Sequence, residues 1–267
     1  MSKVVLITGG SSGIGKSIGE FLHQKGFIVY GTSRNPDRIM HSVFPLISLD
    51  VRDMDSIHKA VAKVIAVSGR LDVVINNAGI GITGPLEEIP MQEIKNNFET
   101  NFFGPIAVMQ AVLPQMRAQE SGLIINITSI AAYMGLPYRS IYSASKGALE
   151  LVTESLRMEV KSFGVAITNV APGDFATNIA SGRFHAPVVE GSAYEATYGL
   201  SLQTMDAHVD NGGNPNEMAI AIYHIIQNPN PKIHYKVGAL MQKISIVIKR
   251  ILPDKVFEKI LMNHYKL

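Results

Sequence analysis

The N-terminal segment constrains the fold more than any other part of the chain. Residues 4–7 are a short aliphatic and β-branched run typical of a buried strand, and a glycine-rich loop follows from Thr8. A helix that ends near Gly26 is then marked by apolar residues at helical spacing, namely Ile14, Ile18, Phe21 and Leu22. A strand, a glycine turn and a helix N-terminus in this order predict an anion site, because free backbone N–H groups point at the ligand.

Three known patterns fit the glycine loop, and the loop alone does not choose between them. Residues 10–17 have the phosphate-loop spacing of nucleoside triphosphatases, with Lys16 and Ser17 in the last two positions. Residues 9–13 fit the nucleophile elbow of hydrolases. The TGxxxGxG form of a dinucleotide-binding turn is matched by Thr8, Gly9, Gly13 and Gly15.

Later segments favour the dinucleotide-binding turn. Residues 27–33 predict a second strand that closes a βαβ unit, and residues 46–49 predict a third, before a helix capped by Asp53 or Asp55. The fourth strand, residues 71–75, runs into Asn76-Asn77-Ala78-Gly79. A triphosphatase needs an aspartate after a late apolar strand to hold magnesium, whereas asparagine is a good hydrogen-bonding residue in a turn.

Composition limits the classes of function. The chain has 267 residues, enough for one large α/β domain, and its hydrophobic and charged shares of 46% and 17% are typical of a globular protein. A formal net charge of +2 gives no reason to expect a nucleic-acid partner. The absence of cysteine excludes disulfides and thiolate catalysis and fits a cytoplasmic protein. No apolar run approaches the length of a membrane span, and the first run is too short for a signal peptide.

Tyr142 and Lys146 are the candidate proton-transfer pair. They are four residues apart in a segment with helical periodicity, so they share one face of a helix. An ammonium one turn away favours the phenolate form of a tyrosine, which suits proton transfer in a partly dry site. Pairs at this spacing are common by chance, so the rest of the chain has to support the interpretation.

In chain order, these segments resemble the short-chain dehydrogenase/reductase family. The motifs are Thr8-Gly9-x-x-x-Gly13-Ile14-Gly15, Asp50, Asn76-Asn77-Ala78-Gly79, Asn101, Ser129, Tyr142-x-x-x-Lys146 and Pro172-Gly173-x-x-x-Thr177. The match is close over residues 3–180 and loose beyond them. The resemblance implies a doubly wound α/β domain with a parallel sheet, the Rossmann fold, and hydride transfer between a nicotinamide dinucleotide and an alcohol or ketone.

The resemblance also implies roles for individual residues. Tyr142 gives the proton to the forming alkoxide, Ser129 binds the carbonyl oxygen, and Lys146 holds the ribose hydroxyls and supports Tyr142. Asn101 would hold a water on the proton path, although an asparagine inside a helix can equally be a solvated surface residue. No metal is expected, and the expected cofactor-binding residues are Gly9, Ser11, Ser12, Gly13, Ile14, Gly15, Ser33, Arg34, Asp50, Val51, Asn77, Ala78, Gly79, Tyr142, Lys146, Pro172, Gly173 and Thr177.

The end of the second strand predicts the cofactor. An acidic residue there normally binds the adenosine ribose hydroxyls and selects NAD. The chain instead has Ser33, which repels no phosphate, followed by Arg34, whose planar guanidinium suits one. We therefore expect NADP(H) to be preferred over NAD(H). Arg34 could instead stack beside the adenine or point to solvent. In addition, many NADP-using relatives carry a basic residue within the glycine loop, and Ser12 in this loop is not basic.

The second half of the chain contributes substrate and partner surfaces. Residues 80–90 predict a loop, and residues 174–213 predict a mobile lid over the substrate or an ordinary surface excursion. Residues 1–238 would form the catalytic domain and 239–267 a helical extension, with residues 231–238 resembling the hydroxysteroid and retinol dehydrogenase branch. Apolar and basic residues alternate in the extension, so it packs on the domain or on a partner subunit, or contacts a membrane surface peripherally.

These observations predict a cytoplasmic or membrane-associated oxidoreductase. The expected substrate is a fairly apolar alcohol or carbonyl compound, and the family resemblance implies a homodimer or homotetramer. Two alternatives from other classes are a non-catalytic dinucleotide sensor and a phosphate-loop triphosphatase. The sensor would usually have lost the tyrosine or the lysine, and both Tyr142 and Lys146 are present.

Overall fold

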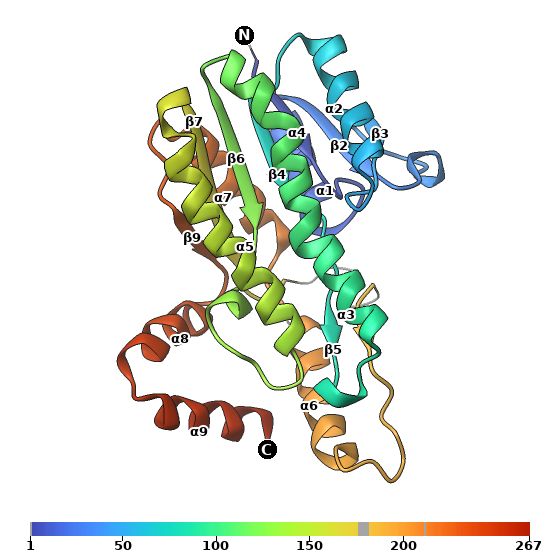
Figure 1. Cartoon of the computed structure of the whole chain (residues 1–267), viewed down its shortest axis with the longest axis vertical. Helices are drawn as coiled ribbons and strands as arrows, with labels where there is room; N and C mark the ends of the chain where they lie inside the picture. Colours follow the sequence, from blue (N-terminus) through green and yellow to red (C-terminus); the bar gives the residue numbers. More distant parts are fainter. Residues whose placement is uncertain (1, 176–181, 211) are drawn as a thin grey trace.

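The centre of the molecule is a parallel sheet of seven strands in the order β3-β2-β1-β4-β6-β7-β9 (Figure 1). The computed structural model describes residues 2–175, 182–210 and 212–267. In register, Val5 of the central strand lies opposite Val29 on one side and Val73 on the other. The strands are β1 (Val4–Ile7), β2 (Ile28–Ser33), β3 (Leu46–Ser48), β4 (Val73–Asn76), β6 (Gly122–Ile127), β7 (Val165–Pro172) and β9 (His234–Val237). The expected doubly wound α/β fold is therefore confirmed.

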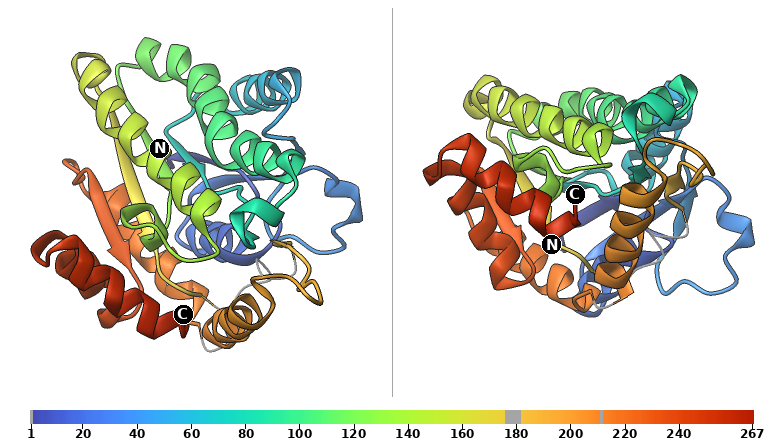
Figure 2. Two further views of the ribbon diagram at one scale, coloured as in Figure 1. Left: turned by 60° about the horizontal axis from the view of Figure 1, so that its bottom comes forward. Right: turned by 90° about the horizontal axis from the view of Figure 1, so that it is seen from below.

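Helices cover both faces of this sheet, which explains why the central strand β1 is apolar at every position. Side chains alternate along β1, so that Val4 and Leu6 join the core beneath α2, α4 and α5, whereas Val5 and Ile7 join the core beneath α1 and α7. The right-hand view of Figure 2 shows α5, α4 and α2 as one layer above the sheet. These helices are α1 (Gly13–Gln24), α2 (Met54–Ser68), α4 (Gly104–Ala118), α5 (Ser140–Glu159) and α7 (Pro215–Gln227).

The segment around Asn101 is not one regular α-helix. Helix α3 (Met91–Phe98) and α4 are joined by a π-helical turn, Glu99–Phe103, and Asn101 is fully buried within it. The interpretation of Asn101 as a solvated surface residue is therefore wrong. A π turn rotates the residues that follow it relative to an α-helix, and such turns are frequent at functional sites.

A small parallel ribbon replaces part of the loop predicted at residues 80–90. Strand β5 (Ile82–Thr83) pairs with β8 (Phe184–His185), and the Thr83 hydroxyl lies 3.0 Å from Nδ1 of His185. The ribbon connects the segment after β4 to the predicted lid, which also contains α6 (Glu195–Asp210). Short 3-10 helices cover Pro36–Arg38, Leu86–Glu88, Ile130–Tyr133 and Lys161–Phe163.

Two helices follow the last strand, α8 (Leu240–Ile251) and α9 (Asp254–Tyr265). They lie with α6 at the end of the molecule to which the arrow of β6 points (Figure 1). Their inner face packs on the domain, because Ile246 and Phe257 form a buried cluster with Met134, and the Ser201 hydroxyl of α6 donates to the Tyr265 carbonyl at 2.9 Å. Within the described residues, no helix has the length and hydropathy needed to cross a membrane.

Candidate active site

The glycine loop adopts a shape that only glycine permits at several positions. Gly9 and Gly13 have φ values of +64° and +53°, and a Cβ on Gly10 would lie 2.7 Å from the Cα of Gly31. A Cβ on Gly15 would collide with the Gly9 carbonyl and the Asn77 side chain. The loop therefore packs tightly against β2 and the end of β4, and it leads directly into the first turn of α1.

The loop geometry separates the three patterns that its sequence fits. Lys16 does not turn back over the loop as a phosphate-loop lysine would, because its ammonium lies 3.8 Å from Glu20 on the half-exposed surface of α1. Ser12 caps α1 without a side-chain hydrogen bond, which leaves the N–H groups of the first turn directed at the space above the loop. No histidine that could activate a hydrolase serine is found among the described residues that line this space.

A cleft of about 460 Å³ runs from the glycine loop across the carboxyl ends of the strands. Most of the predicted cofactor residues line it: Gly9, Ser11, Ser12, Gly13, Ile14, Ser33, Arg34, Asp50, Val51, Asn77, Ala78, Gly79, Tyr142, Lys146 and Pro172. Gly15 lies behind the loop and not on the cleft wall, Gly173 lines a neighbouring pocket, and Thr177 lies outside the described residues. The cleft thus lies outside the carboxyl ends of the strands, where ligands bind in open α/β sheets.

One end of the cleft carries two guanidinium groups. Arg34 lines the cleft directly after β2, and Arg52, which the sequence analysis missed, lies beside Asp50. Arg52 hydrogen-bonds Asp50 at 3.0 and 3.2 Å and holds the pKa of that carboxyl below its ordinary value. Because Asp50 and Arg52 neutralise each other, the excess charge at this end of the cleft is the positive charge of Arg34.

Asn77 connects the end of β4 to the glycine loop. Its amide nitrogen donates to the carbonyls of Thr8 and Gly9 at 3.0 and 3.2 Å, and its backbone N–H donates to the Thr8 hydroxyl at 3.0 Å. The side chain predicted to bind cofactor therefore also fixes the floor of the cleft. In the sequence, the asparagine after the fourth strand indicated a hydrogen-bonding turn residue. Only the structure shows which backbone groups its side chain reaches.

Tyr142 and Lys146 lie on one face of α5 where the cleft meets a second, smaller pocket. Lys146 is only 4% exposed, and its ammonium donates to the Ile127 carbonyl at 2.9 Å. Burial lowers the pKa of Lys146 to about 8. Tyr142 lines both the cleft and the smaller pocket, and the Arg139 guanidinium lies 5.5 Å from the centre of its ring. The site is therefore partly dry, as the sequence analysis expects, and a second cation, Arg139, lies close to the Tyr142 ring.

Ser129 stands at the end of β6, on the wall of the smaller pocket. It is 8% exposed, and its Oγ accepts a hydrogen bond from the N–H of Ala131 at 3.1 Å. Its side chain therefore caps the 3-10 helix Ile130–Tyr133 and also lines the pocket. Because the Ala131 N–H occupies an acceptor position of Oγ, the hydroxyl proton is available to a substrate oxygen.

Asn101 lies behind the cleft and positions the segment after β4. Its Oδ1 accepts from the Ile80 N–H at 2.9 Å, and its Nδ2 donates to the Ile80 carbonyl at 2.8 Å. A Cβ added to Gly79 would lie 3.1 Å from Oδ1 of Asn101 and 3.3 Å from Nζ of Lys146, so all three groups meet at one point. The π turn brings Asn101 to this position, which its place in the sequence did not reveal.

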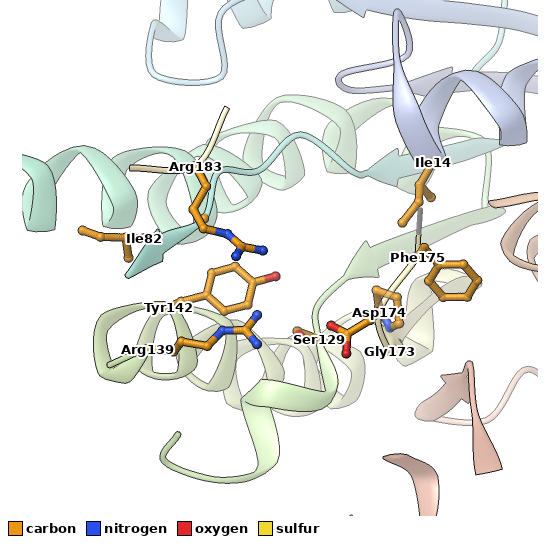
Figure 3. Close-up of a pocket in the computed structure, with 11 residues that line it drawn as sticks. Ile14, Ile82, Ser129, Arg139, Tyr142, Gly173, Asp174, Phe175 and Arg183 are labelled. Carbon is orange, nitrogen blue, oxygen red and sulfur yellow. The ribbon is translucent and has the colours of Figure 1, made fainter. Parts of the chain in front are cut away.

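The smaller pocket, of about 60 Å³, contains side chains that the sequence analysis did not select. Figure 3 shows the Tyr142 hydroxyl directed into it, guanidinium groups on both sides of the ring, and a carboxylate near Ser129. The carboxylate belongs to Asp174, which occupies an unspecified position of the Pro172-Gly173-x-x-x-Thr177 motif and carried no signal of its own. The other missed residues are Gly81, Ile82, Arg139, Phe175 and Arg183 in this pocket, and Thr32, Asn35, Leu49, Ile80, Thr100, Ile127, Thr128 and Gly182 in the cleft.

Comparisons with known proteins agree on one family. A family model described as short chain dehydrogenase matches residues 3–187. A 3-ketodihydrosphingosine reductase of Bacteroides thetaiotaomicron is 40% identical over 264 residues, which cover 98% of each chain. The crystal structure of a short-chain dehydrogenase from Streptomyces avermitilis is 33% identical, covers 97% of this chain and 98% of that one, and superposes with a TM-score of 0.83. The structure of ElxO with NADP bound is 29% identical, with a TM-score of 0.73 and coverages of 89% and 97%.

Proposed function

The chain belongs to the short-chain dehydrogenase/reductase family of NAD(P)-dependent oxidoreductases acting on CH–OH groups, and we propose that it reduces the ketone of a long-chain apolar substrate with NADPH. One observation carries the proposal. Tyr142 lines both the dinucleotide-sized cleft and the smaller pocket, so a proton donor stands where cofactor and substrate would meet. A non-catalytic sensor would not need this junction.

The residues of the cleft fit a nicotinamide dinucleotide. The uncapped first turn of α1 would hold the pyrophosphate, and the buried ammonium of Lys146 would hold ribose hydroxyls. When bound, the nicotinamide supplies the hydride. Tyr142 then gives its proton to the substrate oxygen, and Ser129 donates a hydrogen bond to that oxygen as negative charge develops on it. Asn101 would hold a water that returns a proton towards Lys146.

The preference for NADPH is proposed from the charge around Ser33 and Arg34. Ser33 accepts a hydrogen bond from the Asn35 N–H at 3.3 Å, and no carboxylate takes its place at the end of β2. The nearest carboxylate that lines this part of the cleft, Asp50, is paired with Arg52. Arg34 is then available to a ribose phosphate. The solved relative ElxO, which has NADP bound, supports this assignment.

An apolar substrate is supported by the walls of the smaller pocket and by the lid region. Ile82 and Phe175 line the pocket, and the lid residue Tyr198 is buried in a cluster that includes Ile82 and Ala186. The name of the Bacteroides relative, a 3-ketodihydrosphingosine reductase, supports a lipid ketone as the substrate class. The same name gives less support to the hydroxysteroid and retinol dehydrogenase branch, although steroids and retinoids are also apolar. Following NADPH oxidation with 3-ketones of increasing chain length would test the proposal, and a rate that does not rise with chain length would oppose it.

We further propose that the outer face of α8 and α9 contacts an anionic bilayer surface. Exposed apolar side chains on this face include Met241 at 72% and Ile251 at 73%. Residues 239–267 contain six basic and two acidic side chains, whereas the whole chain has a net charge of only +2. Apolar residues interleaved with basic ones suit the boundary between headgroups and acyl chains. Such a contact would bring the enzyme to a membrane-resident lipid substrate.

A homodimer or homotetramer remains a proposal that rests on the surface of the central helices. Leu151 and Met158 on α5 are 67% and 73% exposed, and Phe103 before α4 is 51% exposed. Large apolar side chains on neighbouring helices suit a subunit interface. Light scattering of the wild type and of Leu151→Arg would test it, since the variant should be monomeric.

A further inference from the structure

Asp174 places a carboxylate in the substrate pocket. It follows Pro172 and Gly173 at the carboxyl end of β7 and lines the smaller pocket together with Ser129 and Tyr142. Figure 3 shows its carboxylate on the side of the pocket where Ser129 lies, facing the space into which the Tyr142 hydroxyl points. An ionised group here lies close to the atoms of the reaction.

The C-terminal extension fixes this carboxylate. Nε2 of Gln242, on α8, donates to Oδ2 of Asp174 at 2.6 Å, and Oε1 of Gln242 accepts from the Asp174 N–H at 3.3 Å. Gly173 leaves room for this contact, because a Cβ there would collide with the Gln242 amide. One neutral amide thus binds both the carboxylate and the backbone N–H of Asp174, and the direction of the side chain does not depend on the substrate.

No basic side chain forms an ion pair with Asp174 within the described part of the chain. Neither arginine that lines the pocket forms an ion pair with it. The Arg139 guanidinium lies over the Tyr142 ring and beside the buried Tyr265 hydroxyl, and Arg183 packs against Gly81. Burial raises the pKa of Tyr265, and Arg139 partly opposes that rise. Asp174 therefore presents its negative charge to the substrate.

An unneutralised carboxylate at this position is unfavourable for the reduction of a neutral ketone. Reduction builds negative charge on the substrate oxygen beside Ser129, and a neighbouring negative charge opposes that build-up. A positive charge on the substrate, between the carbonyl and Asp174, would reverse the effect. It would pair with the carboxylate and also favour the developing alkoxide.

We propose that Asp174 recognises an ammonium group on the carbon next to the substrate carbonyl, so that the preferred substrates are long-chain 2-amino ketones. The inference rests on the proposed ketone reduction and names the substrate class of the same site. 3-Ketodihydrosphingosine, the compound in the name of the Bacteroides relative, is itself a 2-amino 3-ketone. An anionic headgroup is the competing ligand, but Arg139 is already directed at Tyr142 and Tyr265.

A matched pair of ketones tests the role of Asp174. One is a long-chain 2-amino 3-ketone, and the other is the same ketone without the amine. Asp174→Asn removes the charge and keeps an oxygen acceptor for Gln242, whereas Glu190→Gln removes an exposed charge of the lid region as the control. We expect Asp174→Asn to lower kcat/KM for the amino ketone by roughly 30-fold and not to lower it for the deaminated ketone, whose reduction the carboxylate opposes. Glu190→Gln should change neither.

The outcomes separate the inference from the proposed function. If Asp174→Asn lowers kcat/KM equally for both ketones, the residue only anchors α8 and the inference is overturned. A wild-type preference for a ketone with an anionic headgroup would also overturn it, because the arginines would then select the substrate. In both cases the turnover of the deaminated ketone with NADPH would still support ketone reduction. Turnover of neither ketone by the wild type would refute the proposed function itself.

Discussion

The ammonium of Lys146 donates a hydrogen bond to the carbonyl of Ile127, 2.9 Å away at the carboxyl end of β6. The bond places the charge beneath the junction of cleft and pocket, on the same face of α5 as Tyr142. The location is nearly dry, since Lys146 is 4% exposed, and burial lowers the pKa of Lys146 to about 8. Lys146 therefore occupies a functional position and, because its charge is buried, lowers the stability of the folded protein.

Lys146→Met should stabilise the protein in the absence of cofactor. The pKa of Lys146 falls from 10.5 to about 8 on folding, so below pH 8 the folded state holds an unfavourably buried charge. Between about pH 8 and 10.5 the unfolded state binds more protons, and wild-type stability rises with pH. We expect Lys146→Met to raise the free energy of unfolding by about 2 kcal/mol at neutral pH, with a smaller difference near pH 10. Urea unfolding at the two pH values would measure this, and a difference independent of pH would contradict it. Lys161→Met, at an exposed position, is the control.

Tyr142→Phe should abolish turnover and leave NADPH affinity nearly intact. The hydroxyl acts in proton transfer, whereas the ring keeps its contact with Arg139. Lys146→Ala should lose both turnover and affinity, because Lys146 is assigned to the ribose as well as to the proton path. Steady-state rates and a fluorescence titration with NADPH measure the two effects. Retention of more than about a tenth of the wild-type rate by Tyr142→Phe would show that Tyr142 is not the acid. Tyr223→Phe, on α7, removes a hydroxyl outside both pockets and should behave as wild type.

NADPH should bind at least about tenfold more tightly than NADH, roughly 1.4 kcal/mol. Ser33→Asp combined with Arg34→Leu should reverse the preference, because the new carboxylate repels the ribose phosphate and the guanidinium that binds it is gone. Arg38→Leu removes an exposed arginine that does not line the cleft and should leave the preference unchanged. Titration of each protein with both cofactors gives the ratios. Equal affinities in the wild type would refute the assignment of Arg34.

Met241→Glu with Ile251→Glu should weaken binding to anionic vesicles by at least about tenfold, because both changes place charge in the apolar face of α8. Flotation with phosphatidylglycerol vesicles measures binding, and phosphatidylcholine vesicles separate the contribution of charge. Val67→Glu alters an equally exposed apolar residue on α2 and should bind as wild type. If the wild type does not float with anionic vesicles in low salt, the membrane contact is wrong.

Local patterns in the sequence were sufficient for the main sheet and for the alignment of Tyr142 with Lys146. Buried parallel strands are continuous apolar runs, and residues four apart share a helix face, so both features depend on neighbours along the chain. The glycine positions of the first loop follow from local backbone conformation, as Gly9 and Gly13 show. The sequence thus determined the fold class and the family. It missed the two-residue strands β5 and β8, because a pair of residues carries no periodicity.

Only the tertiary structure decided which side chains meet at the site. Asp174 and Gln242 are 68 positions apart, and Asn101 reaches Ile80 through a π turn that an apolar helical pattern does not reveal. Lys16 fits a phosphate-loop motif in the sequence but pairs with Glu20 on the surface of α1. Contacts of this kind depend on where distant segments pack, and the packing is set by the summed burial of many side chains. The charge environment of the substrate pocket is therefore a property of the folded chain and not of any single motif.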